Sequence, residues 1–227
     1  MTHSLNPNRR HFSLCLAATL ALGHAGAAQA QASAPAKAKA EPLVLVVGDS
    51  LSAEYGLRRG SGWVALTEEK LASEKLRARV VNASISGDTT SGGRSRLPAL
   101  LKQHQPSVVV IELGGNDALR GLPLSMTRDN LTAMVKAAKA TGARVLLLGM
   151  DMPPNYGAKY AQEFRELFVA VAREEKAALV PFFLKGVADT ADPLALFQSD
   201  RIHPNEKAQP IMRDTVWPEL RKLVAAG

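Results

Sequence analysis

Cysteine and histidine are scarce in this chain, and their scarcity excludes several kinds of site. The 227 residues contain one cysteine, Cys15, and five histidines, three of which lie among the first thirty residues. A disulfide framework needs paired cysteines, and a zinc site needs a cluster of sulfur or imidazole ligands. Beyond residue 30 only His104 and His203 remain, far apart in the sequence. We therefore expect no disulfide, no metal and no cofactor in the mature protein.

The common signatures of phosphate and nucleic-acid binding are also missing. The sequence contains no G-x-x-x-x-G-K-[ST] and no G-x-G-x-x-G after a predicted strand. The formal net charge is +7, but the basic residues are scattered and aromatic residues make up only 5% of the chain. Nucleic-acid binding usually requires basic residues gathered in a patch or run. The sequence thus favours a solvated basic surface and predicts no nucleic-acid partner.

The N-terminal residues resemble an export signal. Arg9 and Arg10 precede an apolar run that begins at about Phe12, and residues 28–30 form a small-x-small cleavage pattern. The apolar run is too short to span a bilayer comfortably. We predict a signal peptide at 1–30, no stable membrane anchor, and a periplasmic or secreted mature protein. Both the general secretory and the twin-arginine export routes stay open.

The rest of the chain alternates short apolar runs with longer helical patterns. A flexible leader rich in alanine and lysine is predicted at 31–41, followed by a single domain at 42–227. The predicted strands are 43–47, 79–83, 107–113, 144–149 and 179–183, and the predicted helices are 62–76, 91–104, 126–140, 158–177 and 205–224. This alternation indicates a doubly wound α/β domain with a parallel sheet covered by helices on both faces. Pro218 lies inside the last helical pattern, where we expect it to kink or break the helix.

The first predicted strand ends in an unusual group of small polar residues, Gly48-Asp49-Ser50-Leu51-Ser52. Such residues are ordinary in turns, but a serine at the end of a buried strand can also be a nucleophile. Ligands of open parallel sheets bind outside the carboxyl ends of the strands. The loops after the predicted strands are polar, rich in glycine or both, so these loops are where any chemistry should lie.

One histidine follows the last predicted strand and can serve that serine. A serine becomes a good nucleophile when a base lies within hydrogen-bond reach. His203 lies on the expected side of the sheet, whereas His104 ends a helix at the opposite side and suits a surface position. Asp200 stands three residues before His203, so it can accept a hydrogen bond from the ring and hold the required tautomer. Alternatively, His203 is simply a loop residue before a helix.

Acyl transfer also needs hydrogen-bond donors for the developing oxyanion. The candidates are the backbone N–H of Ser50, the backbone N–H of Gly87 and the side-chain amide of Asn116. Gly87 can equally be a turn glycine, and Asn116 a left-handed turn residue. Two neighbouring carboxyl groups, Glu112 and Asp117, are expected to shape the Asn116 loop rather than to react.

Three further expectations concern the same loops. Asp49 should order the turn through backbone hydrogen bonds, and Asp88 should be a turn residue. Ser52 lies too far past the strand end to be the first choice of nucleophile. The loop "MDMPPNYG" follows the fourth strand, and we expect its residues Met152 and Tyr156 to border the substrate pocket.

Four segments of the sequence together resemble the conserved blocks of a known family. They are "GDSLS" at 48–52, Gly87, "GGND" at 114–117 and "DRIHPN" at 200–205. In this order and spacing they are similar to the blocks of the SGNH hydrolases, also called the GDSL esterase family. The longer segments "ELGGNDALRG" and "PPNYG" resemble the branch of exported bacterial arylesterases and thioesterase/lysophospholipase enzymes.

The resemblance implies a fold, a mechanism and a substrate class. It implies a flavodoxin-like sheet in strand order 2-1-3-4-5, with Ser50 as nucleophile and His203 as base, assisted by Asp200. It places Ser50, Gly87 and Asn116 in the oxyanion hole. The implied activity is hydrolysis of small-molecule carboxylic esters, thioesters or lysophospholipids without metal or cofactor. A carbohydrate O-acetyl esterase and a non-catalytic binding module remain the alternatives, and nothing in the sequence predicts the oligomeric state.

Overall fold

The computed structural model describes residues 41–152 and 154–226, which contain one five-stranded sheet. The strands are β1 (Leu43–Gly48), β2 (Arg79–Asn82), β3 (Val108–Glu112), β4 (Arg144–Leu148) and β5 (Ala178–Val180). All pair in parallel, in the order β2-β1-β3-β4-β5. The doubly wound fold and its strand order are therefore confirmed. The predicted signal peptide, and the predicted leader except for its last residue, lie outside the described residues.

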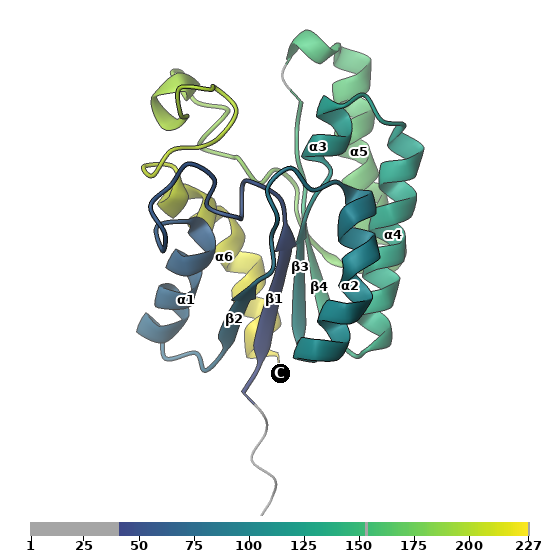
Figure 1. Ribbon diagram of the computed structural model, residues 1–227, viewed down its shortest axis with the longest axis vertical. Helices are drawn as coiled ribbons and strands as arrows, with labels where there is room; N and C mark the ends of the chain where they lie inside the picture. The colour runs from purple at the N-terminus through teal and green to yellow at the C-terminus, as the bar shows by residue number, and fades with distance from the viewer. Residues whose placement is uncertain (1–40, 153, 227) are drawn as a thin grey trace, which may run out of the picture. The chain divides into compact units, whose positions relative to one another are not determined.

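Helices cover both faces of this sheet (Figure 1). α1 (Trp63–Ser73) and α6 (Gln209–Ala225) pack together on one face, and α2 (Thr90–His104), α4 (Leu124–Ala140) and α5 (Ala158–Glu175) pack in a row on the other. Three short helices lie in loops: α3 (Gly115–Leu119), η1 (Pro154–Tyr156) and η2 (Pro193–Leu196). Across 41–152 and 154–226, no helix combines the length and apolar character needed to span a bilayer.

The central strands are buried on both sides, as expected for a parallel sheet between helical layers. Every residue of β1 and β3 is buried, including the carboxyl-bearing Glu112 at the end of β3. The helical layers add aromatic contacts, with Phe164 and Phe168 packed edge to face at 5.2 Å between ring centroids. Burying an aliphatic or aromatic side chain of this size stabilises the fold by about 1.5–3 kcal/mol. The core thus forms a rigid base for the loops at the carboxyl ends of the strands.

Two elements, β5 and α6, differ from the prediction in ways that the structure explains. β5 ends at Val180, earlier than predicted, because Pro181 follows and has no N–H to donate to a neighbouring strand. α6 starts later than predicted and runs through Pro218 to Ala225, so the expected break does not occur. The buried side chains of Trp217 and Leu220 on either side of the proline hold the helix against the sheet.

Candidate active site

The turn after β1 presents Ser50 at the carboxyl edge of the sheet. Asp49 orders this turn as expected: its Oδ1 accepts the N–H of Leu51 at 3.0 Å, and its backbone oxygen accepts the N–H of Ala53 at 2.9 Å. Among the residues that the structure describes, the N–H of Ser50 has no acceptor. The turn therefore leaves both a hydroxyl and an amide hydrogen of one residue available for chemistry.

Gly48, just before the turn, is required by a close approach. A Cβ at this position would lie 2.7 Å from Oε2 of Glu112 and 2.8 Å from Oγ of Ser52. Real Cβ atoms do not come so close to other atoms. Only glycine therefore lets the carboxyl group of Glu112 lie beneath the turn.

A chain of hydrogen bonds joins Ser50, His203 and Asp200. Oγ of Ser50 lies 2.9 Å from Nε2 of His203, and Nδ1 of His203 lies 2.7 Å from Oδ2 of Asp200. The other oxygen of Asp200 accepts the backbone N–H groups of His203 and Ile202, each at 3.0 Å. These two backbone hydrogen bonds, followed by the contact with the imidazole, lower the pKa of Asp200 to about 2. Asp200 is therefore a carboxylate throughout the working pH range.

Asp200 and His203 lie on a small hairpin between η2 and α6, which we call the histidine hairpin (residues 197–204). Phe197 and Pro204 form an isolated antiparallel bridge, and the N–H of Gln198 donates to the backbone oxygen of His203 at 2.7 Å. Arg201, at its tip, adopts a φ of +60°. The hairpin folds the carboxylate back onto the ring of the imidazole.

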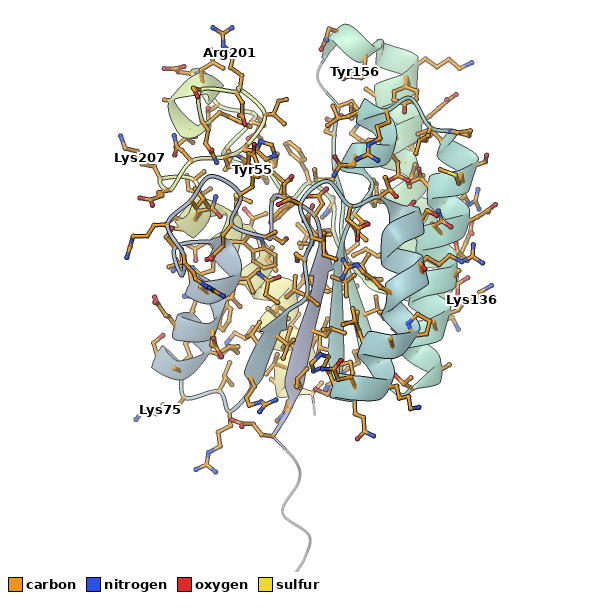
Figure 2. All side chains as sticks on the ribbon, in the orientation of Figure 1. Tyr55, Lys75, Lys136, Tyr156, Arg201 and Lys207 are labelled. Atoms are coloured by element: carbon orange, nitrogen blue, oxygen red, sulfur yellow. The ribbon has the colours of Figure 1, made fainter. Side chains whose placement is uncertain are left out.

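Two contacts tie the histidine hairpin to the loop after Ser50. The side-chain amide of Gln198 donates to the backbone oxygen of Tyr55 at 2.8 Å, and the ring of Tyr55 lies 4.3 Å from the ring of His203 between centroids. In Figure 2, Tyr55 and Arg201 lie in the upper left of the view, and Tyr156 lies in the upper right. Sequence reasoning missed Gln198 and Tyr55, because neither belongs to a motif and their contact spans 143 positions.

The predicted oxyanion residues come from neighbouring loops. Nδ2 of Asn116 donates to Oδ2 of Asp49 at 2.9 Å, which leaves its second hydrogen for another acceptor. Gly87 has a φ of +79°, and its backbone oxygen accepts a hydrogen bond from Arg120 at 2.7 Å. Its own N–H has no acceptor within 41–152 and 154–226. Arg120, which sequence reasoning missed, thereby links the Gly87 loop to the segment that carries Asn116.

Asp117 holds the same two loops together from below. It is fully buried and accepts hydrogen bonds from the backbone N–H and the hydroxyl of Thr90, at the start of α2. Asp88 pairs with Arg96 of α2 at 2.8 Å and also accepts the N–H of Thr89. Both acids therefore shape the loops, as the sequence indicated.

Next to the Ser50 turn lies a buried polar group that we call the site floor: Asp49, Ser52, Trp63 and Glu112. The hydroxyl of Ser52 donates to Oε2 of Glu112 at 2.7 Å and accepts the indole N–H of Trp63 at 3.1 Å. Ser52 is 1% exposed, and its hydroxyl joins Trp63 to Glu112. Burial raises the pKa of Asp49 to about 6, although hydrogen bonds from Leu51 and Asn116 act in the opposite direction.

The loop after β4 lies at the same edge. Met152 is buried, Tyr156 is exposed, and Asp151 pairs with Arg165 of α5 at 2.8 Å. Within the described part of the chain, no cluster of three or more His, Cys, Asp or Glu side chains is placed to hold a metal ion. The chemistry available here is that of a hydroxyl, an imidazole, a carboxylate and amide donors.

Residues 46–210 match the model of the GDSL-like Lipase/Acylhydrolase family. The chain is 53% identical to Esterase TesA of Pseudomonas aeruginosa over 181 residues, which cover 80% of this chain and 89% of that protein. It is 43% identical to Thioesterase 1/protease 1/lysophospholipase L1 of Escherichia coli over 181 residues, covering 80% and 84% of the two chains.

The chain is also similar in structure to solved esterases of related sequence. The crystal structure of TesA superposes with a TM-score of 0.77 at 53% identity and covers 80% of this chain and 99% of that chain. The psychrotrophic esterase EstA from Pseudoalteromonas sp., inhibited by monoethylphosphonate, superposes with a TM-score of 0.76 at 42% identity, covering 82% and 100%.

Proposed function

This chain belongs to the GDSL-like lipase/acylhydrolase family and hydrolyses ester bonds, and we propose that Ser50 is its nucleophile. His203 is the general base in this proposal, and Asp200 orients it. The observation that carries the proposal is the continuous hydrogen-bond chain from Ser50 Oγ through the imidazole to Asp200, at 2.9 and 2.7 Å.

The proposed reaction has two halves. Oγ of Ser50 attacks the carbonyl carbon while Nε2 of His203 accepts the hydroxyl proton, and a tetrahedral intermediate forms. Collapse of this intermediate breaks the bond to the leaving alcohol or thiol, which takes the proton from Nε2. A water molecule then attacks the acyl-enzyme with His203 again as base, releasing the acid and restoring Ser50. Asp200 stabilises the imidazolium in both halves without taking its proton.

The oxyanion hole in this proposal consists of the N–H groups of Ser50 and Gly87 and one hydrogen of the Asn116 amide. The two unpaired backbone donors and the anchoring of Asn116 on Asp49 support this assignment. One such donor is worth roughly 10²–10³ in kcat when it is removed from a serine hydrolase. The low pKa of Asp200 further supports its role, because a carboxylate that accepts the hydrogen bond from Nδ1–H carries the negative charge that stabilises the imidazolium.

The substrates we propose are small or lipid-derived esters, including thioesters and lysophospholipids. The names of the relatives support this range: one is called an esterase and another a thioesterase and lysophospholipase. The loop with Met152 and Tyr156 lies beside the site and is proposed to border the pocket. The signal-like N-terminus supports a periplasmic or secreted location.

A fluorophosphonate probe tests the nucleophile, since it reacts with activated serines. We expect the wild-type protein to be labelled and Ser50→Ala to be unlabelled, with kcat for p-nitrophenyl butyrate lower by about 10⁴-fold or more. Ser125→Ala, at an exposed position on α4, is the matched control and should retain labelling. Labelling of Ser50→Ala at the wild-type rate would contradict the proposal.

A further inference from the structure

Glu112 is a buried acid at the active site that the proposed triad does not use. Its side chain is fully buried at the end of β3, and Oε2 accepts the N–H of Asp49 at 3.2 Å and the hydroxyl of Ser52 at 2.7 Å. Oε1 is also buried, and among the described residues it has no hydrogen-bond partner. A carboxylate with one oxygen unpaired and no contact with water would be costly to bury.

The surroundings of Glu112 also disfavour a negative charge. Burial raises its pKa well above the ordinary value, and the charge of Asp49 raises it further. The other two members of the site floor, Ser52 and Trp63, are uncharged. The nearby guanidinium of Arg96, on α2, donates to the backbone oxygen of Gly48 and pairs with Asp88 instead.

Asp49 is the better of the two carboxyl groups to carry the single negative charge. It accepts hydrogen bonds from the N–H of Leu51 and from the amide of Asn116, one on each oxygen, and the imidazole of His203 also favours its charged form. Two negative charges that are both buried and adjacent repel strongly, so one proton is retained by the pair. The hydrogen bonds assign that proton to Glu112.

We propose that Glu112 is a positioning residue that acts as an uncharged acid beneath the nucleophile. It holds the turn through the N–H of Asp49 and the hydroxyl of Ser52, and by staying neutral it leaves Asp49 as the carboxylate that orients Asn116 toward the oxyanion. This inference rests on the proposed function, because it assigns Asn116 to the oxyanion hole. Gly48 is part of the same arrangement, because a side chain at this position would collide with the carboxyl group of Glu112.

Infrared difference spectroscopy reads the proton directly. A spectrum of wild type minus Glu112→Gln at pH 7.5 should contain the carbonyl stretch of a protonated carboxylic acid, shifted in D₂O. The matched control is Glu74→Gln, an exposed acid beside Arg221 at the far end of α1, whose difference spectrum should show a lost carboxylate instead. A lost carboxylate band in the Glu112→Gln spectrum would overturn the proposal, whatever the activity.

Steady-state kinetics then distinguishes a role of Glu112 in positioning the active site from a role in folding. Glu112→Gln keeps an acceptor oxygen and no charge, so we expect kcat within about fivefold of wild type, whereas Glu112→Ala strands two buried donors and should lower kcat by roughly 10- to 100-fold with KM within about twofold. Rates are compared at temperatures where near-ultraviolet circular dichroism shows each variant folded.

Two further outcomes complete the test. If Glu112→Ala does not fold, the Glu112→Gln spectrum and rate decide alone, and a loss of kcat above about 30-fold in folded Glu112→Gln would overturn the proposal. Failure of the proposed function looks different: the fluorophosphonate probe would then label Ser50→Ala as fast as wild type, independently of any change at Glu112.

Discussion

Two aspartates lie close to the candidate nucleophile, and the pKa values of their carboxyl groups are shifted in opposite directions. Asp49, in the site floor, is 2% exposed and has a pKa raised to about 6. Asp200, in the histidine hairpin, has a side chain that is 36% exposed and a pKa lowered to about 2. The hairpin carboxylate accepts two backbone N–H groups and the imidazole while still in contact with water. The floor carboxylate has comparable partners, but desolvation outweighs them.

The two regions therefore support the same serine by different means. The floor lies where β1 and β3 end, with Trp63 contributed by α1, and it holds the buried charge of Asp49, which disfavours folding. The hairpin extends from the loop between β5 and α6 over the carboxyl edge of the sheet (Figure 1). It is held by local hydrogen bonds and by its contacts with the Tyr55 loop. We expect changes in the floor to alter stability together with activity, and changes in the hairpin to alter activity alone.

Among the substitutions that test this difference between floor and hairpin, Asp200→Asn is expected to lower kcat the most. The nitrogen that replaces Oδ2 in asparagine cannot accept the hydrogen bond from Nδ1–H of His203. The imidazole therefore loses both its orientation and the stabilisation of its positive charge. We expect kcat to fall by roughly 10²- to 10⁴-fold. Asp200, with its depressed pKa, contributes stability above its ordinary pKa that disappears as pH falls toward 2. Solvent screens the charge of this exposed side chain, so its contribution to stability is small and the Tm at pH 8 should change little.

Steady-state kinetics with p-nitrophenyl butyrate and thermal unfolding at pH 8 measure this prediction. Asp214→Asn, an exposed aspartate beside Arg213 on α6, controls for loss of a surface charge. A large fall in Tm together with the loss of kcat would show that the histidine hairpin is a stability element after all.

A smaller loss of activity, with a gain in stability, is expected from Asp49→Asn. Asparagine offers one acceptor oxygen where aspartate has two, so either Leu51 or Asn116 loses its partner, and kcat should fall by about 10- to 100-fold. Folded Asp49 holds its proton up to about pH 6 whereas the ordinary value is 3.8. The wild-type protein therefore loses stability as pH rises through this window, and the variant does not.

Urea unfolding at pH 8 and pH 4 checks the sign of this effect. The variant should be more stable than wild type at pH 8, by at most about 3 kcal/mol before the lost hydrogen bond is counted. The difference should shrink at pH 4, where Asp49 is protonated in the folded wild type and, with an ordinary pKa of 3.8, is near its midpoint in the unfolded chain. A variant that is less stable by the same amount at both pH values would show that the charge of Asp49 does not oppose folding.

The contrast between floor and hairpin also explains what the sequence could predict. The pairing of Asp200 with His203 is local, three residues apart, so the spacing together with a serine at the same edge of the sheet indicates it. The gathering of Ser50, Gly87 and Asn116 follows from the rule that loops after parallel strands share one edge. The strand order follows instead from the resemblance to the SGNH hydrolases.

Other features depend on contacts that no local pattern encodes. Glu112 ends an apolar strand, and its position under Ser52 depends on the pairing of β1 with β3. Arg120 contacts Gly87 through a loop whose path the sequence does not fix. The unbroken course of α6 through Pro218 depends on the burial of its neighbours rather than on helix propensity.

The smallest predicted effect concerns Gln198, which joins the histidine hairpin to the loop after Ser50. Its side-chain amide donates to the backbone oxygens of Tyr55, at 2.8 Å, and of Pro204, at 3.1 Å. Gln198→Ala removes both donors but keeps the backbone hydrogen bond to His203, so the hairpin should still form while the imidazole spends less time beside Ser50. We expect kcat and the fluorophosphonate labelling rate to fall by about three- to tenfold, with KM and Tm nearly constant, since each neutral hydrogen bond contributes about 0.5–1.5 kcal/mol.

Gln198→Glu sharpens this test, because it keeps the size of the side chain and removes both N–H donors. It should be at least as slow as Gln198→Ala, since a carboxylate would face two carbonyl oxygens. Gln162→Ala, at an exposed position on α5 where the side-chain amide donates to Glu166, should keep the wild-type rate. If Gln198→Glu labels as fast as wild type, the hydrogen bond from Gln198 to Tyr55 does not hold the imidazole in place. The histidine hairpin must then be positioned against the loop after Ser50 by the ring contact of Tyr55 with His203 instead.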